Sequence, residues 1–169
     1  MKRYAIIPTR ETEDNCQNPR KTVGKLNRFL TEAGWVVYFA RNADSMLGAL
    51  REGLKSCDVT SHDYIIFCHD DIEILSDIHL FHNELERHLS QHKAGFAGIA
   101  GTTLLGEDAV WWDHARWKQG LHRGHVYHGK DLHSYDNTFY GKPGQVVVMD
   151  GLFLAAKAKT LTAIGLDKP

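Results

Sequence analysis

The clearest candidate site for chemistry is a pair of adjacent carboxylates, Asp70 and Asp71, which follow the apolar run Tyr64–Cys68 and His69. A strand buried on both faces has a continuous apolar sequence of this kind, and open α/β sheets bind ligands just beyond the carboxyl ends of their strands. Mg²⁺ and Mn²⁺ commonly bind one or two protein carboxylates together with substrate phosphates. The doublet therefore predicts a metal-assisted nucleotide or phosphate site.

Two simpler interpretations of this segment stay open at the level of sequence. An Asp-Asp pair after a strand can also cap a helix or lie in a solvated turn. His69 fits the end of the strand or a residue that orients Asp71 better than it fits a metal ligand.

The strands and helices that must position the doublet recur at regular intervals along the sequence. Apolar runs typical of strands begin near Tyr4, Trp35, Tyr64 and Gly95, at intervals of 31, 29 and 31 residues. A βαβ unit needs about thirty residues. The intervening segments place apolar residues on one face of a helix. These residues are Val23, Leu26, Leu30 and Ala33, then Met46, Leu47, Leu50 and Leu54, then Ile78, Phe81, Leu85 and Leu89.

Residues that commonly begin and end helices agree with these boundaries. Gly34 follows the first helix as a C-cap, whereas Asp44 or Ser45, and Ser76 or Asp77, are expected to cap the next two. Strands that alternate with helices predict a mostly parallel sheet covered on both faces. We therefore expect an α/β fold for residues 1 to about 101.

If these strands run parallel, polar residues from four loops meet at one edge of the sheet. They are Thr9 and Arg10, Arg41 and Asn42, His69 to Asp71, and Gly101 to Thr103. Taken singly, Arg10 or Asn42 is as well explained as a solvated loop residue. Only the acidic doublet is clearly better explained as part of a site than as a pair of solvated loop residues.

After Thr103 the regular alternation of strand and helix patterns ends. Residues 106 to 144, which are rich in Trp, His and Gly, predict a long irregular insertion. Within it, Trp111, Trp112 and Trp117 could stack on sugar rings while Asp113 and His114 bind hydroxyls. Alternatively, these rings pin the loop onto the sheet. Beyond the insertion we expect strands over 146 to 149 and 152 to 156, and a short helix from about 157 to 164.

The composition excludes several classes of protein. Twenty basic and 21 acidic residues leave a net charge of −1, which gives no reason to expect nucleic acid as a partner. The three cysteines are widely spaced, and no signal peptide or transmembrane segment is evident, so we expect a cytoplasmic protein. The eleven histidines lack the spacing of zinc motifs. P-loop, dinucleotide-binding and serine-hydrolase motifs are also missing.

The segment from Asn42 to Leu75, with its His-Asp-Asp motif, resembles the family 2 glycosyltransferases of the GT-A fold, especially a bacterial branch. The later segments 148 to 155 and 164 to 167 resemble the acceptor-side strand and helix of the same family. The resemblance implies a GT-A-like sheet flanked by helices in a single domain, residues 1–169. Residues 1–103 would form the nucleotide-binding half, and residues 104–169 an acceptor-side half that is truncated at its carboxyl end.

The resemblance also implies an activity and a set of site residues. A sugar would pass from a nucleotide-sugar, expected to be a UDP-sugar, to a hydroxyl of a glycan or lipid-linked acceptor, with Mn²⁺ or Mg²⁺ on the diphosphate. Asp71 would bind the metal, Asp70 the ribose or the metal, and Thr9, Arg10 and Asn42 the nucleotide base.

One departure from the family concerns the catalytic base. The acidic motif that supplies it should follow a segment like Gly165 to Asp167, but the sequence ends at Pro169. Asp150 is the remaining candidate, either as base or as a residue that binds sugar hydroxyls, with Gly151 permitting close approach of a sugar. The alternatives are a non-catalytic module that binds nucleotide-sugars or glycans and, less well supported, a metal-dependent phosphoesterase.

Overall fold

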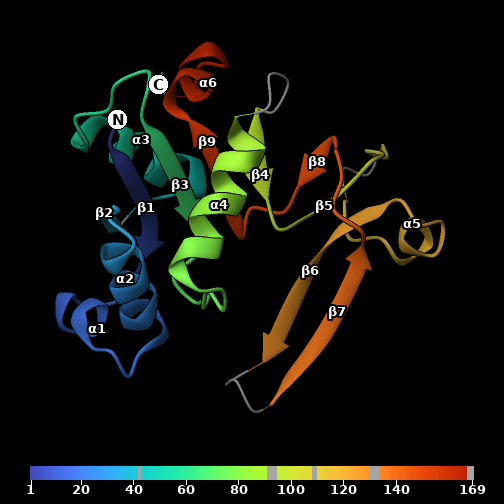
Figure 1. Ribbon diagram of the computed structural model, residues 1–169, viewed down its shortest axis with the longest axis horizontal. Coiled ribbons are helices and arrows are strands. Elements are labelled where there is room, and N and C mark those ends of the chain that lie inside the picture. The colour runs from blue at the N-terminus through green and yellow to red at the C-terminus, as the bar shows by residue number, and fades with distance from the viewer. Residues whose placement is uncertain (42, 91–94, 108–109, 130–133, 167–169) are drawn as a thin grey trace. The chain divides into compact units, whose positions relative to one another are not determined.

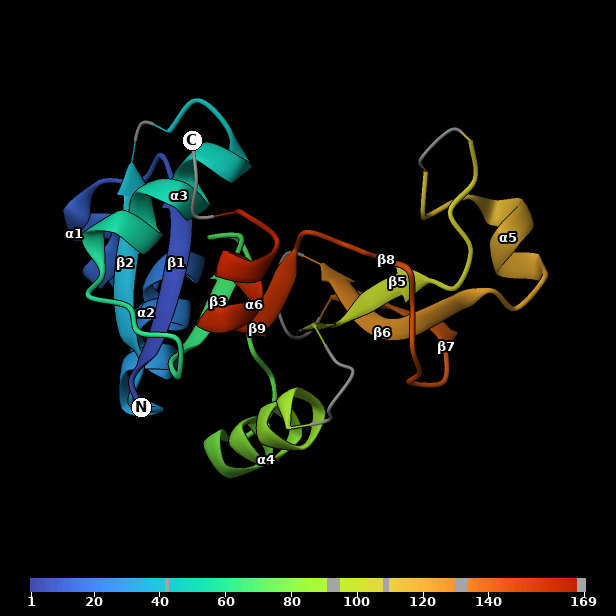
Figure 2. The same ribbon diagram turned by 90° about the horizontal axis from the view of Figure 1, so that it is seen from above.

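The computed structural model describes residues 1–41, 43–90, 95–107, 110–129 and 134–166. The chain divides into two compact units (Figures 1 and 2). Unit 1 comprises Met1–Ala97 and Leu152–Pro169, and unit 2 comprises Gly98–Gly151. No helix among the described residues is long and apolar enough to cross a membrane.

Unit 1 is built on a five-stranded sheet with the order β2-β1-β3-β9-β4. Its strands are β1 (Arg3–Thr9), β2 (Val36–Arg41), β3 (Tyr64–Cys68), β4 (Phe96–Gly98) and β9 (Phe153–Lys157). Strand β1 runs parallel to both β2 and β3, with Thr9 opposite Arg41 and Ile6 opposite Phe67. The carboxyl ends of these three strands therefore lie at one edge of the sheet.

Helices cover both faces of this sheet. They are α1 (Glu13–Gln17), α2 (Thr22–Glu32), α3 (Met46–Ser56), α4 (Ile78–Leu89) and α6 (Ala158–Ala163). Helices α3 and α6 contribute Leu50 and Leu161 to a buried cluster that also contains Ile6 of β1. On the other side, Phe81 of α4 packs against Phe29 of α2 at a ring-centroid distance of 5.3 Å. Figure 2 shows α4 on the side of the sheet opposite α3 and α6.

The predicted helix boundaries are confirmed by their caps. The Ser45 hydroxyl accepts a hydrogen bond from the backbone N–H of Gly48, and the Asp77 carboxylate accepts one from Leu80. These two residues, rather than Asp44 and Ser76, are the N-caps. Gly34 follows α2 with a φ of +76°, the left-handed conformation in which glycine is favoured.

The α/β architecture is confirmed, but the expectation of a mostly parallel sheet is wrong in one respect. Strand β9 lies beside β3 and runs antiparallel to it, with Phe67 opposite Leu154 and Ile65 opposite Ala156. The sheet is therefore mixed. The apolar run over 152 to 156 predicts a strand, but it indicates neither the direction of that strand nor its neighbour, because both depend on contacts distant in sequence.

Unit 2 corrects the prediction of a long irregular insertion. It contains a four-stranded antiparallel sheet with the order β7-β6-β5-β8. The strands are β5 (Ala100–Thr102), β6 (His122–Gly129), β7 (Tyr135–Gly141) and β8 (Val148–Met149), and a short helix, α5, spans His114–Lys118. Many residues of β6 and β7 are exposed, so these strands lack the alternating apolar pattern that a half-buried strand shows.

Candidate functional site

The carboxyl edge of the first sheet brings together two of the predicted site residues, Thr9 and Asp70. Thr9 is the last residue of β1, and its hydroxyl Oγ1 lies 2.5 Å from Oδ2 of Asp70, just beyond β3. The same Oγ1 accepts a hydrogen bond from the backbone N–H of Glu11 at 3.0 Å. Thr9 is buried, with 7% of its surface exposed, and Asp70 is half-buried. The parallel pairing of β1 with β3 places these two residues side by side.

Asp71 has a different environment from its neighbour. Its side chain is 78% exposed, and its Oδ1 lies 3.9 Å from Nδ1 of His69, too far for a hydrogen bond. The main chain of His69 is held separately: its backbone N–H donates a hydrogen bond to the carbonyl of Leu152, the residue that precedes β9. The doublet therefore offers one carboxylate held by the protein and one exposed to solvent.

Carboxylate oxygens, which both members of this pair supply, are ligands that Mg²⁺ and Mn²⁺ prefer. Among the described residues, no group of three or more His, Cys, Asp or Glu side chains could hold a metal ion unaided. Mg²⁺ typically takes one or two protein carboxylates and completes its octahedron with water and substrate phosphates. Asp70 and Asp71 could supply that protein share.

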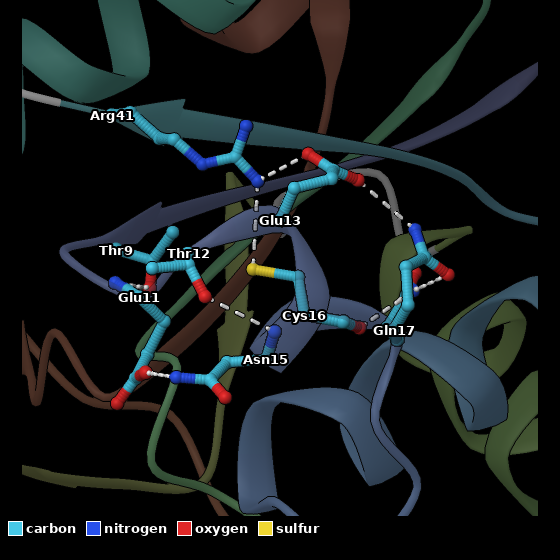
Figure 3. A network of polar contacts seen from close by, with 9 residues as sticks. Thr9, Glu11, Thr12, Glu13, Asn15, Cys16, Gln17 and Arg41 are labelled. Carbon is cyan, nitrogen blue, oxygen red and sulfur yellow. Dashed lines mark hydrogen bonds and ion pairs between the residues drawn. The ribbon is translucent and has the colours of Figure 1, made fainter.

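Next to Thr9, a network of polar contacts joins the end of β2 to helix α1 (Figure 3). Arg41 donates a hydrogen bond to Oε2 of Glu13 at 2.6 Å and lies 3.6 Å from the thiol of Cys16. Its guanidinium also lies over the Phe39 ring, 5.6 Å from the centroid. The contacts with Cys16 and with Glu13 raise the pKa of Arg41, which stays charged.

Sequence reasoning placed Arg41 at this edge but missed Glu13 and Cys16. No local signal identifies them, because their partner is 25 or more residues away. A hydrogen bond from Gln17 and the bond and charge of Arg41 hold the pKa of Glu13 below its usual value. The ion pair therefore fastens α1 to β2 at neutral pH.

The remaining residues predicted for this edge are less informative. Arg10 is exposed in the loop after β1, and Asn42 lies outside the described residues. The expectation that Gly101 to Thr103 form a loop after the fourth strand of the first sheet is wrong, because Gly101 and Thr102 lie within β5, a strand of the four-stranded sheet. The apolar run that begins near Gly95 is interrupted at Ile99, so that its first part forms β4 of the five-stranded sheet and its second part forms β5 of the four-stranded sheet.

In unit 2 the two adjacent tryptophans have different environments. Trp111 is only 7% exposed, and its ring packs against Tyr140 and His122 at centroid distances of 5.5 and 5.8 Å. This ring anchors its loop within unit 2. Trp112 is 64% exposed and leaves its ring accessible. The carboxylate of Asp113 accepts a hydrogen bond from Ala115 as the N-cap of α5.

Asp150 and Gly151 follow β8 at the end of unit 2. The backbone N–H of Asp150 donates to the carbonyl of Ala100 at 2.9 Å, which fixes its main chain beside β5. Burial, and then the charge of Asp150, raise the pKa of Tyr140, so this carboxylate and phenol lie within electrostatic reach of each other. A Cβ on Gly151 would meet no atom within 4 Å, so the space beside this residue is open.

A mixed α/β sheet flanked by helices, with two carboxylates beyond a buried strand, is compatible with a nucleotide-dependent transferase. Comparison of the sequence with known families shows that residues 26–160 match the glycosyltransferase-like family. The match covers well over half of the chain and includes both carboxylates, and the chain therefore belongs to this family. No curated protein matches the sequence.

Membership of this family supports a general glycosyltransferase function. It implies a nucleotide-sugar donor and an acceptor. The resemblance noted in the sequence is thereby confirmed at the level of the family.

Proposed function

We propose that the protein transfers a sugar from a UDP-sugar to a hydroxyl of a glycan or lipid-linked acceptor, with Mn²⁺ or Mg²⁺ as cofactor. The observation that carries this proposal is the Asp70-Asp71 doublet at the carboxyl edge of β3. One of its carboxylates is hydrogen-bonded to Thr9, and the other is exposed. Residues 1–103 would form the nucleotide-binding part of one glycosyltransferase-like domain that spans residues 1–169.

Each residue at this edge has a proposed role. Asp71 would bind the cation, Asp70 would bind the cation or the ribose, and Thr9, Arg10 and Asn42 would border the nucleotide base. The bound cation would neutralise the negative charge that develops on the diphosphate as the sugar departs. The hydrogen bond from Thr9 holds Asp70 in place before the donor binds, so that this carboxylate needs little reorganisation on binding.

Unit 2 carries the residues proposed for the acceptor. The exposed ring of Trp112 could stack on the apolar face of a sugar, because aromatic rings pair favourably with such surfaces. Trp111 would support that loop from the interior of the unit, and Asp113 would keep α5 in place. The open space beside Gly151 would admit a sugar hydroxyl. Asp150 would then accept the proton of the attacking hydroxyl.

A thermal-shift measurement tests the cation and donor parts of the proposal. At about one hundred times its Kd, a ligand stabilises the folded state by roughly 2.7 kcal/mol. We expect UDP with Mn²⁺ to raise the melting temperature, and Asp71→Ala to abolish most of that rise. The control is Asp58→Ala, which removes a carboxylate that is 91% exposed in the loop before β3 and should leave the response intact.

Two results would count against the proposal. If no nucleoside diphosphate with Mn²⁺ changes the melting temperature of the wild-type protein, the proposal of a nucleotide-sugar donor fails. If UDP stabilises the protein equally with and without Mn²⁺, metal dependence is refuted. Release of UDP from a UDP-sugar in the presence of acceptor glycans would separate an active transferase from a module that only binds.

A further inference from the structure

We infer that Thr9 is a positioning residue: its hydroxyl fixes the carboxylate of Asp70 for the divalent cation that the doublet would share with a diphosphate. This inference rests on the proposed function and adds to it a residue that acts through Asp70. It gives Thr9 a role in addition to bordering the nucleotide base. It also makes Asp70 the carboxylate whose geometry is set before any ligand binds.

The direction of the hydrogen bond follows from the partners of Thr9. Its Oγ1 accepts from the backbone N–H of Glu11 at 3.0 Å, and a hydroxyl has only one proton to donate. An ionised carboxylate can only accept, so that proton points at Oδ2 of Asp70, 2.5 Å away. A bond between a hydroxyl and a carboxylate is among the short and strong hydrogen bonds of proteins.

Thr9 itself has little freedom to move. It is buried, it is paired in register with Arg41 at the end of the β1–β2 ladder, and its β-branched side chain has restricted rotamers. The Glu11 amide that orients its hydroxyl belongs to the loop leading into α1. Figure 3 shows this loop with the contacts around it: Glu11 accepts a hydrogen bond from the side chain of Asn15 at 2.5 Å.

The two carboxylates of the doublet consequently differ in preorganisation. Asp70 is half-buried, with one oxygen held by Thr9, whereas the side chain of Asp71 is 78% exposed and has no hydrogen bond to His69 at 3.9 Å. Residues that orient a metal-binding carboxylate typically contribute 10- to 100-fold to metal affinity. We therefore expect loss of the Thr9 hydroxyl to weaken binding about tenfold or more.

The experiment measures the affinity of the full chain for Mn²⁺ in the presence of saturating UDP, from the electron paramagnetic resonance signal of free Mn²⁺. Thr9→Val keeps the shape of the side chain and removes the donor, and it should weaken Mn²⁺ binding about tenfold. Thr9→Ser keeps the donor and should stay within about threefold of wild type. Thr9→Cys has a weak donor and should fall between them, and it serves as the second variant if Thr9→Val does not fold.

A matched control exists in the same unit. Thr60 also donates its hydroxyl to a carboxylate, Oδ2 of Asp63 at 2.9 Å, in the loop before β3. Thr60→Val therefore deletes the same kind of bond at the other end of that strand. It should lower stability and leave the affinity for Mn²⁺ unchanged.

The inference is overturned if Thr9→Val binds Mn²⁺ as tightly as wild type, or if Thr9→Ser is as weak as Thr9→Val. Equal weakening by Thr60→Val would also overturn it, because the effect would then be one of general stability. If the wild-type protein binds no Mn²⁺ with UDP, the proposed function fails together with the inference. If the wild type binds and the threonine series is flat, only the inference fails.

Discussion

Asp63 offers the sharpest test of how a buried carboxylate stabilises unit 1. The residue is 1% exposed and lies immediately before β3. Its Oδ1 accepts a hydrogen bond from the backbone N–H of Lys2 at 2.5 Å, and its Oδ2 accepts from the backbone N–H and the hydroxyl of Thr60 at 2.8 and 2.9 Å. The carboxylate thus joins the start of β1 to the loop before β3.

The expected loss of stability follows from these three bonds. Hydrogen bonds to charged groups contribute about 1.5–3 kcal/mol each, and an unsatisfied buried donor costs a similar amount. Asp63→Asn can still accept from Thr60 but presents an amide to Lys2, so we expect a loss of about 2 kcal/mol. Asp63→Ala removes all three acceptor contacts and should cost about 4 kcal/mol.

The difference between wild type and Asp63→Asn should also depend on pH. Burial alone would raise the pKa of Asp63, but hydrogen bonds from Lys2 and Thr60 and the nearby amino terminus hold the pKa below its ordinary value. A carboxylate with a lowered pKa in the folded state contributes its full stabilisation above the unfolded pKa of about 3.9. That contribution disappears as the pH falls through the folded pKa, and the asparagine variant has none to lose.

Urea denaturation of both proteins at pH 7 and at pH 3 measures this difference. We expect a gap of about 2 kcal/mol at pH 7 that narrows at pH 3. Asp58→Asn is the control, because the side chain of Asp58 is 91% exposed, and it should change stability by less than about 0.5 kcal/mol. An unchanged gap between pH 7 and pH 3, or an asparagine variant as stable as wild type, would refute the reasoning.

Three further predictions concern packing and reactivity. Gly53→Ala should destabilise the protein by about 1–2 kcal/mol in urea denaturation, because the added Cβ would lie 2.5–2.8 Å from three carbons of Ile6. An equal loss of stability in an Ile6→Ala background would show that the clash with Ile6 is not the cause. Gly124→Ala should lower the free energy of unfolding by on the order of 3 kcal/mol and weaken the near-ultraviolet circular dichroism signal, because Gly124 has φ +111° and an added Cβ would lie 2.0 Å from the carbonyl oxygen of Ile99. An unaltered spectrum and an unaltered stability would contradict this prediction. Burial raises the pKa of Cys68 to about 12, so iodoacetamide at pH 8 should label this thiol in urea but not in the native protein. Rapid labelling of the native protein would contradict this prediction, because it would show that the thiol is accessible and reactive.

The sequence identified the elements whose signals are local. Ser45 caps α3 and Asp77 caps α4, each one of the two cap candidates that the sequence offered there, and Gly34 lies just beyond α2 in the left-handed conformation. The apolar run Tyr64–Cys68 is a buried strand that ends just before His69 and the acidic doublet. Each of these features is encoded within a few neighbouring residues, because caps and amphipathic periods depend on local backbone geometry.

Other features could not be read from neighbouring residues. The apolar run over 152 to 156 predicted a strand, but the antiparallel place of β9 beside β3 depends on pairing with residues about ninety positions earlier. The β6–β7 hairpin was missed because its exposed positions give no alternating pattern, and its strands are stabilised mainly by each other. Trp111 and Trp112 are identical and adjacent in sequence, yet one is buried and the other exposed.

In the candidate site, too, some features follow from the local sequence and others from the tertiary structure alone. The sequence alone determined that two carboxylates follow a buried strand, and that Thr9 ends another strand, because strand runs and their ends are local properties. Only the tertiary structure decided that Thr9 contacts Asp70 and not Asp71, and that Arg41 is bound by Glu13. A hydrogen bond between residues 61 positions apart exists only when two strands pair in one register, and that register is fixed by the packing of the whole sheet.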